Sequence, residues 1–122
     1  MERFEETIEA IPEDVWGFIV DPGALSAWFG ADAWMDLAEG GAVRFRFADG
    51  TQRRGTVVEV ERFRRLRWRW REHRGAGFGL ELGSASTVTI ELVGDGDVTR
   101  VRITEEPETS VDASARGGSS VP

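Results

Sequence analysis

Alternation of apolar and polar residues, repeated from residue 43 onward, restricts the fold more than any other feature of the sequence. Five segments show it: residues 43–47, 52–61, 66–72, 87–92 and 100–104. A period of two places every second side chain on the same face of a strand. Asp49-Gly50 and the run 94–97 are hairpin signals between such segments. The sequence therefore predicts an antiparallel sheet with one buried and one solvated face.

The first 40 residues follow a different pattern. Residues 3–9 predict a first strand, and a short helix begins at Pro12, where a proline and two acids suit the first helical turn. Asp21-Pro22-Gly23 ends that helix, and residues 24–29 predict a second brief helical segment. Residues 33–37 predict the next strand.

The segment 66–72, LRWRWRE, has two interpretations: interleaved arginine and tryptophan could hold a nucleic acid, or the segment is a strand with a wet and a dry face. The net charge of −7 weighs against a nucleic-acid partner. Glu59 and Glu61 offer acidic partners to the arginines across the sheet. We therefore expect a strand whose buried face combines these residues: Val58, Val60, Leu66, Trp68, Trp70, Val88 and Ile90.

Composition limits the other classes of protein. With 122 residues, the chain has room for one domain, and no window has the apolar length of a membrane span. The N-terminus lacks the features of a secretory signal, and the sequence contains no cysteine. We expect a cytoplasmic protein without a membrane partner.

The order of these elements resembles the START-like helix-grip superfamily, also called SRPBCC. Within it, the sequence is most similar to the homologues of the activator of the heat-shock protein 90 ATPase, specifically to their C-terminal domain. The resemblance covers about residues 3–106 and rests on these motifs: Ile11-Pro12-x-x-Val15-Trp16, Asp21-Pro22-x-x-Leu25-x-x-Trp28-Phe29, Glu39-Gly40-Gly41-x-Val43-x-Phe45, Asp49-Gly50, Gly55-x-Val57, Leu66-x-Trp68-x-Trp70 and Thr99-Arg100-Val101.

The resemblance implies an α+β fold: a curved antiparallel sheet of six to seven strands, with two short helices after the first strand, that grips a long C-terminal helix around an apolar cavity. Residues 1–107 would form this domain. Residues 108–122 instead predict a flexible tail rich in Ser, Gly and Ala, without an apolar stripe. The long helix would then be absent, truncated or supplied by another chain. An uncovered sheet face of this kind predicts a homodimer.

Aromatic residues are the strongest indication of a ligand site, although they could equally fill a solid core. The candidate cavity residues are Trp28, Phe29, Trp34, Phe45, Phe47, Trp68, Trp70, Phe78 and Ile90. The superfamily includes carriers of small hydrophobic ligands, and we expect this function, with the glycine-rich loop 75–83 as a gate. The alternative is a protein-interaction domain with a chaperone partner in the stress response.

A catalytic site is the third hypothesis. His73, the single histidine, and Asp36 are candidate polar groups at the cavity, where either could act as an acid or a base. One histidine and no cysteine provide no ligand set for zinc or haem, and the glycine spacing of residues 75–79 is not a dinucleotide motif. We expect no metal and no cofactor, and catalysis as a cyclase or hydrolase ranks below ligand binding and protein interaction.

Overall fold

The computed structural model describes residues 2–74 and 81–108, which form two helices and seven strands. The elements in chain order are β1 (Glu2–Ile8), α1 (Pro12–Ile19), α2 (Pro22–Phe29), β2 (Ala31–Met35), β3 (Ala42–Phe47), β4 (Gln52–Glu61), β5 (Arg65–Arg74), β6 (Glu81–Asp95) and β7 (Val98–Pro107). All strands pair antiparallel in one sheet, in the order β1-β7-β6-β5-β4-β3-β2. The predicted α+β architecture, with two short helices after the first strand, is confirmed.

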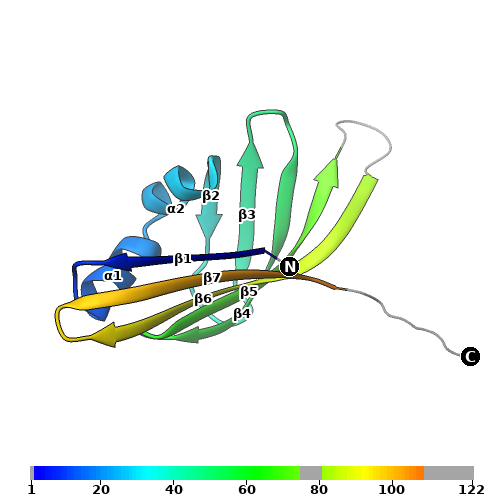
Figure 1. The fold of residues 1–122 in the computed structure, drawn as a ribbon. Coiled ribbons are helices and arrows are strands. Elements are labelled where there is room, and N and C mark those ends of the chain that lie inside the picture. The colour runs from blue at the N-terminus through cyan, green and yellow to red at the C-terminus, as the bar shows by residue number, and fades with distance from the viewer. Residues whose placement is uncertain (1, 75–80, 109–122) are drawn as a thin grey trace, which may run out of the picture.

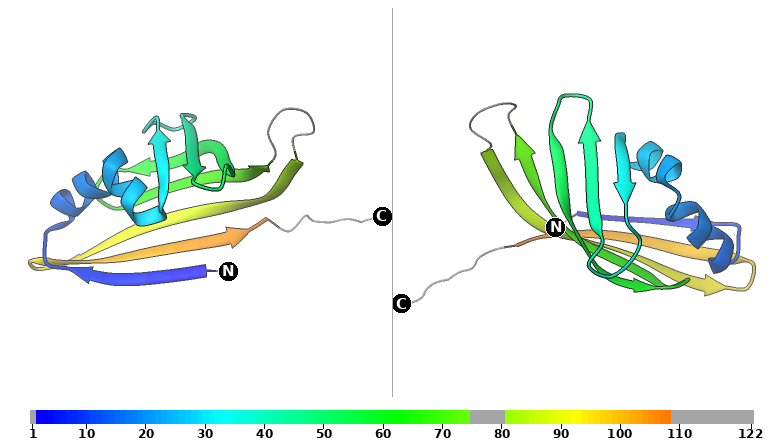
Figure 2. Two further views of the ribbon diagram at one scale, coloured as in Figure 1. Left: turned by 90° about the horizontal axis from the view of Figure 1, so that it is seen from above. Right: turned by 180° about the vertical axis from the view of Figure 1, so that it is seen from behind.

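The sheet is strongly curled. Figure 1 shows β1 and β7 at one edge running across the direction of β2 and β3 at the other edge. Both helices lie on the same side of the sheet, as the two views in Figure 2 show. Helix α1 packs against β6 and β7, whereas α2 packs against β2. We call the side covered by the helices the inner face and the opposite side the outer face.

Both helices begin where the local sequence satisfies their first turn. Pro12 occupies the start of α1, where its missing amide hydrogen costs no intrahelical bond. Asp21 caps α2, because its carboxylate accepts a hydrogen bond of 3.0 Å from the backbone N–H of Ala24. Helix α2 therefore begins at Pro22, two residues before the predicted start. Gly30 ends it with a left-handed φ of 64°.

A bulge in β4 corrects one predicted part of the core. Val57 pairs with Trp68, but the next paired residue is Glu59, opposite Arg67, so Val58 is the extra residue. Val58 was predicted to face the core, but it is 42% exposed, and Val57 is buried instead. The bulge changes which residues point inward, and an alternation pattern contains no sign of it.

The outer face of β5 resolves the question posed by LRWRWRE. Arg65 lies 3.3 Å from Glu59 on β4 and 3.3 Å from Glu91 on β6. Arg67 lies 3.6 Å from Glu59 and donates a hydrogen bond to Thr89. Leu66, Trp68 and Trp70 are buried on the inner face. The prediction of a strand with arginines on the wet face, paired to acids of neighbouring strands, is confirmed.

Some predictions fall outside the described residues. The C-terminal tail lies there except for Glu108, and so do Phe78 and most of the glycine-rich loop. Within the described ranges, α1 and α2 lack the length and apolar character needed to cross a membrane.

Candidate functional site

Four aromatic rings pack together on the inner face. Phe45 lies with its centroid 5.9 Å from that of Trp68 in a stacked arrangement, and 4.9 Å from that of Trp70 at a right angle. Phe29, from α2, contacts all three rings at centroid distances of 5.1 to 6.0 Å. Such offset and edge-to-face pairs stabilise a core beyond the area that they bury. This aromatic cluster joins α2 to the middle of the sheet.

A groove of about 410 Å³ lies beside the aromatic cluster. Five of its seven lining residues are apolar; the seven are Arg3, Phe4, Trp28, Phe29, Val88, Ile103 and Glu105. They come from β1, α2, β6 and β7, so the first and the last strand of the sheet meet at one site with α2. We call this site the inner groove. Its volume is within the range of small-molecule sites, about 300–1,000 Å³.

The predicted cavity residues divide into three groups. Trp28 and Phe29 line the inner groove. A second group packs in the core beneath or beside it: Phe45, Phe47, Trp68, Trp70 and Ile90. Trp34 is the exception among the described candidates, because it lies on the outer face, 48% exposed, with the guanidinium of Arg44 at 5.9 Å from its ring. The inner face thus contains both a solid aromatic core and a groove.

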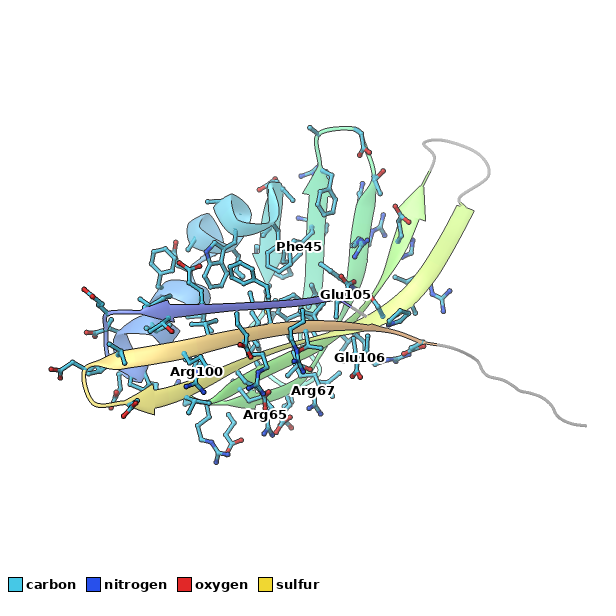
Figure 3. The ribbon with its side chains drawn as sticks, in the orientation of Figure 1. Phe45, Arg65, Arg67, Arg100, Glu105 and Glu106 are labelled. Atoms are coloured by element: carbon cyan, nitrogen blue, oxygen red, sulfur yellow. The ribbon has the colours of Figure 1, made fainter. Side chains whose placement is uncertain are left out.

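A polar cluster crosses four neighbouring strands at the wall of the groove. Oε2 of Glu105 accepts three hydrogen bonds: from Ser86 Oγ at 2.6 Å, Arg53 Nη1 at 2.9 Å and Trp70 Nε1 at 3.1 Å. The Arg53 guanidinium also lies 4.8 Å from the centre of the Trp70 ring. In Figure 3, Glu105 and Phe45 lie on the inner side of the sheet, whereas Glu106 lies on the outer side. We call these four residues, Glu105, Ser86, Arg53 and Trp70, the Glu105 cluster.

The Glu105 cluster favours an ionised carboxylate. Burial alone would raise the pKa of Glu105, but the hydrogen bonds from Ser86 and Trp70 and the positive charge of Arg53 outweigh burial. The pKa of Glu105 is therefore held below its ordinary value of 4.5. At neutral pH the wall of the groove carries a fixed negative charge next to a fixed positive charge.

This shift predicts an acid-sensitive part of the stability. The folded protein has the lower pKa for Glu105, so ionisation stabilises the fold above the unfolded value of 4.5, and the contribution disappears as the pH falls through the folded pKa. We expect the stability advantage of wild type over Glu105→Gln, measured by urea unfolding, to be full at pH 7 and to shrink as the pH falls from 5 to 3.

Comparing wild type with Glu105→Gln cancels the contributions of the other carboxylates to the pH dependence of stability, because both proteins contain them. Glu5 is one of these, since its hydrogen bond from Arg102 lowers the pKa of Glu5 as well. A stability difference between wild type and Glu105→Gln that stays constant from pH 7 to pH 3 would contradict the linkage to Glu105.

The two candidate catalytic residues do not line the inner groove. Asp36 is exposed and follows β2, which ends at Met35 rather than at the predicted residue 37. His73 is half-buried on β5, opposite Gln52 of β4, and its Nδ1 has no hydrogen-bond partner among the described residues. Within the same ranges, no group of three acidic or histidine side chains could hold a metal ion.

The polar residues of the groove were not predicted from the sequence, although a signal was present. Glu105 has the same parity as the inward-facing Val101 and Ile103, and Arg53 has the same parity as Val57. A charged residue at a position where the alternation expects an apolar one is a candidate functional residue. Applied to β7, this criterion would have selected Glu105. It would have missed Arg53, because the sequence placed Val58 and Val60 on the buried face of β4, and only the bulge at Val58 puts Arg53 on the inner face.

Comparison with known proteins agrees with this fold. The model of the family "Activator of Hsp90 ATPase homolog 1-like protein" matches residues 9–120, nearly the whole chain. The chain belongs to this family. For this member of the Activator of Hsp90 ATPase homolog 1-like family, the resemblance seen in the sequence is confirmed, and with it the START-like helix-grip fold.

Solved structures similar to this family member include three with high coverage of its chain. Mll3558 from Rhizobium loti is 25% identical over 91% of this chain and 81% of its own, with a TM-score of 0.67. CalU16 from Micromonospora echinospora is 28% identical over 89% and 60%, with a TM-score of 0.61. DynU16, from the dynemicin biosynthetic locus, is 24% identical over 88%, with a TM-score of 0.70, and this chain spans 37% of its length. None of the curated proteins matches.

Proposed function

We propose that this START-like domain binds an apolar small molecule in the inner groove. The observation that carries the proposal is the groove itself: about 410 Å³, with mainly apolar walls, beside a rigid aromatic cluster. Binding sites for small molecules combine apolar walls with a few fixed polar groups, and Glu105 is such a group. The chaperone-partner hypothesis draws its support from the family description, whereas ligand binding draws on the groove.

Tryptophan fluorescence would report directly on binding. Trp28 lines the groove, and Trp70 is linked to its wall through the hydrogen bond to Glu105. We expect prodan, a neutral fluorescent probe without a hydrogen-bond donor, to bind at one site per chain. Its emission should shift to shorter wavelength, and tryptophan emission should fall as the site fills. A simultaneous measurement of mass by light scattering shows whether a second copy of the chain occupies the same face.

A pair of variants tests the location of the probe. Ile103 lines the groove, so Ile103→Trp places a large ring inside it and should weaken prodan binding at least about tenfold, or about 1.4 kcal/mol. Thr104→Trp adds the same ring at the next residue of β7, where the alternation of the strand turns it to the outer face. This control should bind prodan as wild type does.

Two results would contradict the proposal. One is an absence of saturable binding up to the solubility limit of prodan in a monomeric protein. The other is saturable binding that Ile103→Trp and Thr104→Trp leave equally unchanged, because the probe would then occupy another site.

A further inference from the structure

The two oxygens of the Glu105 carboxylate have different surroundings. Oε2 accepts hydrogen bonds from Ser86, Arg53 and Trp70, at 2.6 to 3.1 Å. Among the residues whose side chains the structure describes, 3–73 and 85–108, none donates a hydrogen bond to Oε1. An ionised carboxylate has about four acceptor sites over its two oxygens. The unused acceptor sites of Glu105 are therefore concentrated on Oε1.

Glu105 brings its carboxylate to the inner groove. Glu105 lines the inner groove together with apolar residues of α2, β6 and β7, and its side chain is 27% exposed. The three bonds to Oε2 fix the carboxylate of β7 against β6, β5 and β4, so a bond to Oε1 would cost no further loss of side-chain freedom. A bond to a charged, pre-oriented acceptor is stronger than one between neutral groups.

The neighbouring charges decide which donor fits. Arg53 already neutralises Glu105, and Arg3 adds a second positive charge to the lining of the groove. A cationic ligand would meet a carboxylate that Arg53 already neutralises, together with the positive charge of Arg3. An anionic ligand would bring a further acceptor to Oε1. A neutral hydroxyl group avoids both the repulsion between positive charges and the meeting of two acceptors, because it donates a hydrogen bond without bringing a charge.

We infer that the inner groove selects apolar ligands that carry a neutral hydroxyl group, such as a phenol or a polycyclic alcohol, and that Glu105 Oε1 accepts the hydroxyl proton. This inference rests on the proposed function and adds a ligand class and a specificity-determining residue to it. The apolar body of the ligand would lie against Trp28, Phe29 and Ile103.

A matched pair of probes isolates the hydroxyl group. In 2-naphthol the hydroxyl can donate a hydrogen bond, whereas 2-methoxynaphthalene has a methyl ether in its place and cannot. At pH 7 both probes are neutral. We expect wild type to bind 2-naphthol about tenfold more tightly, which corresponds to about 1.4 kcal/mol. Isothermal titration calorimetry or displacement of prodan measures both dissociation constants.

The variant Glu105→Gln changes the hydrogen-bonding character of the wall with little change in size. Its amide oxygen can accept the bonds from Ser86, Arg53 and Trp70, which leaves the NH₂ group, a donor, in the place of Oε1. Both probes have an oxygen that can accept a hydrogen bond from this NH₂ group. The tenfold preference for 2-naphthol should therefore fall until the two affinities are nearly equal. Glu106→Gln is the matched control, the same substitution at the next residue and on the outer face (Figure 3), and should keep the wild-type preference.

Each result supports or overturns the inference. Equal affinities of wild type for the two probes would overturn it, whether or not Glu105→Gln folds, and prodan binding would then still support the proposed function. A preference for 2-naphthol that persists in a folded Glu105→Gln protein would also overturn it. If wild type binds none of the three probes, the proposed function fails and the inference fails with it.

Discussion

Trp68→Ala is expected to reduce the free energy of unfolding by about 3–5 kcal/mol, the range for truncation of a large buried aromatic residue. Trp68 has no exposed surface and contacts Phe29, Phe45 and Trp70 at centroid distances of 5.6 to 6.0 Å. Its removal would leave a cavity between α2 and the sheet. For a domain of this size, such a loss is a large share of the total free energy of unfolding.

Urea unfolding, followed by circular dichroism, measures the effect of Trp68→Ala. Trp34→Ala is the matched control, since Trp34 is half exposed on the outer face, where the guanidinium of Arg44 lies 5.9 Å from its ring. We expect the control to lose about 1 kcal/mol or less. Similar losses for the two variants would contradict the assignment of Trp68 to the centre of the core.

Gly55→Ala is expected to have the second largest effect, a loss of about 3 kcal/mol. Gly55 lies opposite Trp70, and backbone atoms of β5 occupy the space beside its Cα. A methyl group at residue 55 would overlap the carbonyl oxygen of Arg69 and come within 2.6 Å of the Trp70 Cα. These are backbone atoms, so the strands themselves would have to separate.

A second glycine provides the control for Gly55→Ala. Gly17 lies within α1, and apart from the adjoining residues and the backbone of the helix itself, no atom of the described residues lies within 4 Å of a Cβ added there. Gly17→Ala should therefore stabilise the protein by up to about 1 kcal/mol, since alanine favours the helix. Thermal unfolding of the two variants should shift in opposite directions. Equal shifts would indicate that the backbone contact at Gly55 is relieved without cost.

The alternation of apolar and polar residues was sufficient to predict the one-sided antiparallel sheet, because burial of one face of a strand requires an apolar residue at every second position. It predicted which face of LRWRWRE is buried and that Glu59 would pair with its arginines. It failed where backbone geometry changes without a change in residue type: the bulge beyond Val57 exposes Val58. It also failed to predict the Glu105 cluster, because Arg53 and Glu105 lie 52 residues apart and meet only after the sheet has curled.

The pairing of β1 with β7 has a consequence for how the chain folds during synthesis. β1 is made first, yet the strand beside it is the last of the described elements, and the ion pair Glu5–Arg102 joins residues 97 positions apart. Until β7 is complete, Phe4 and Ile8 have no sheet edge to join. Contacts between such distant residues slow folding, because most of the chain must be ordered before they form. The N-terminal strand should therefore gain its protection from hydrogen exchange among the last parts of the sheet.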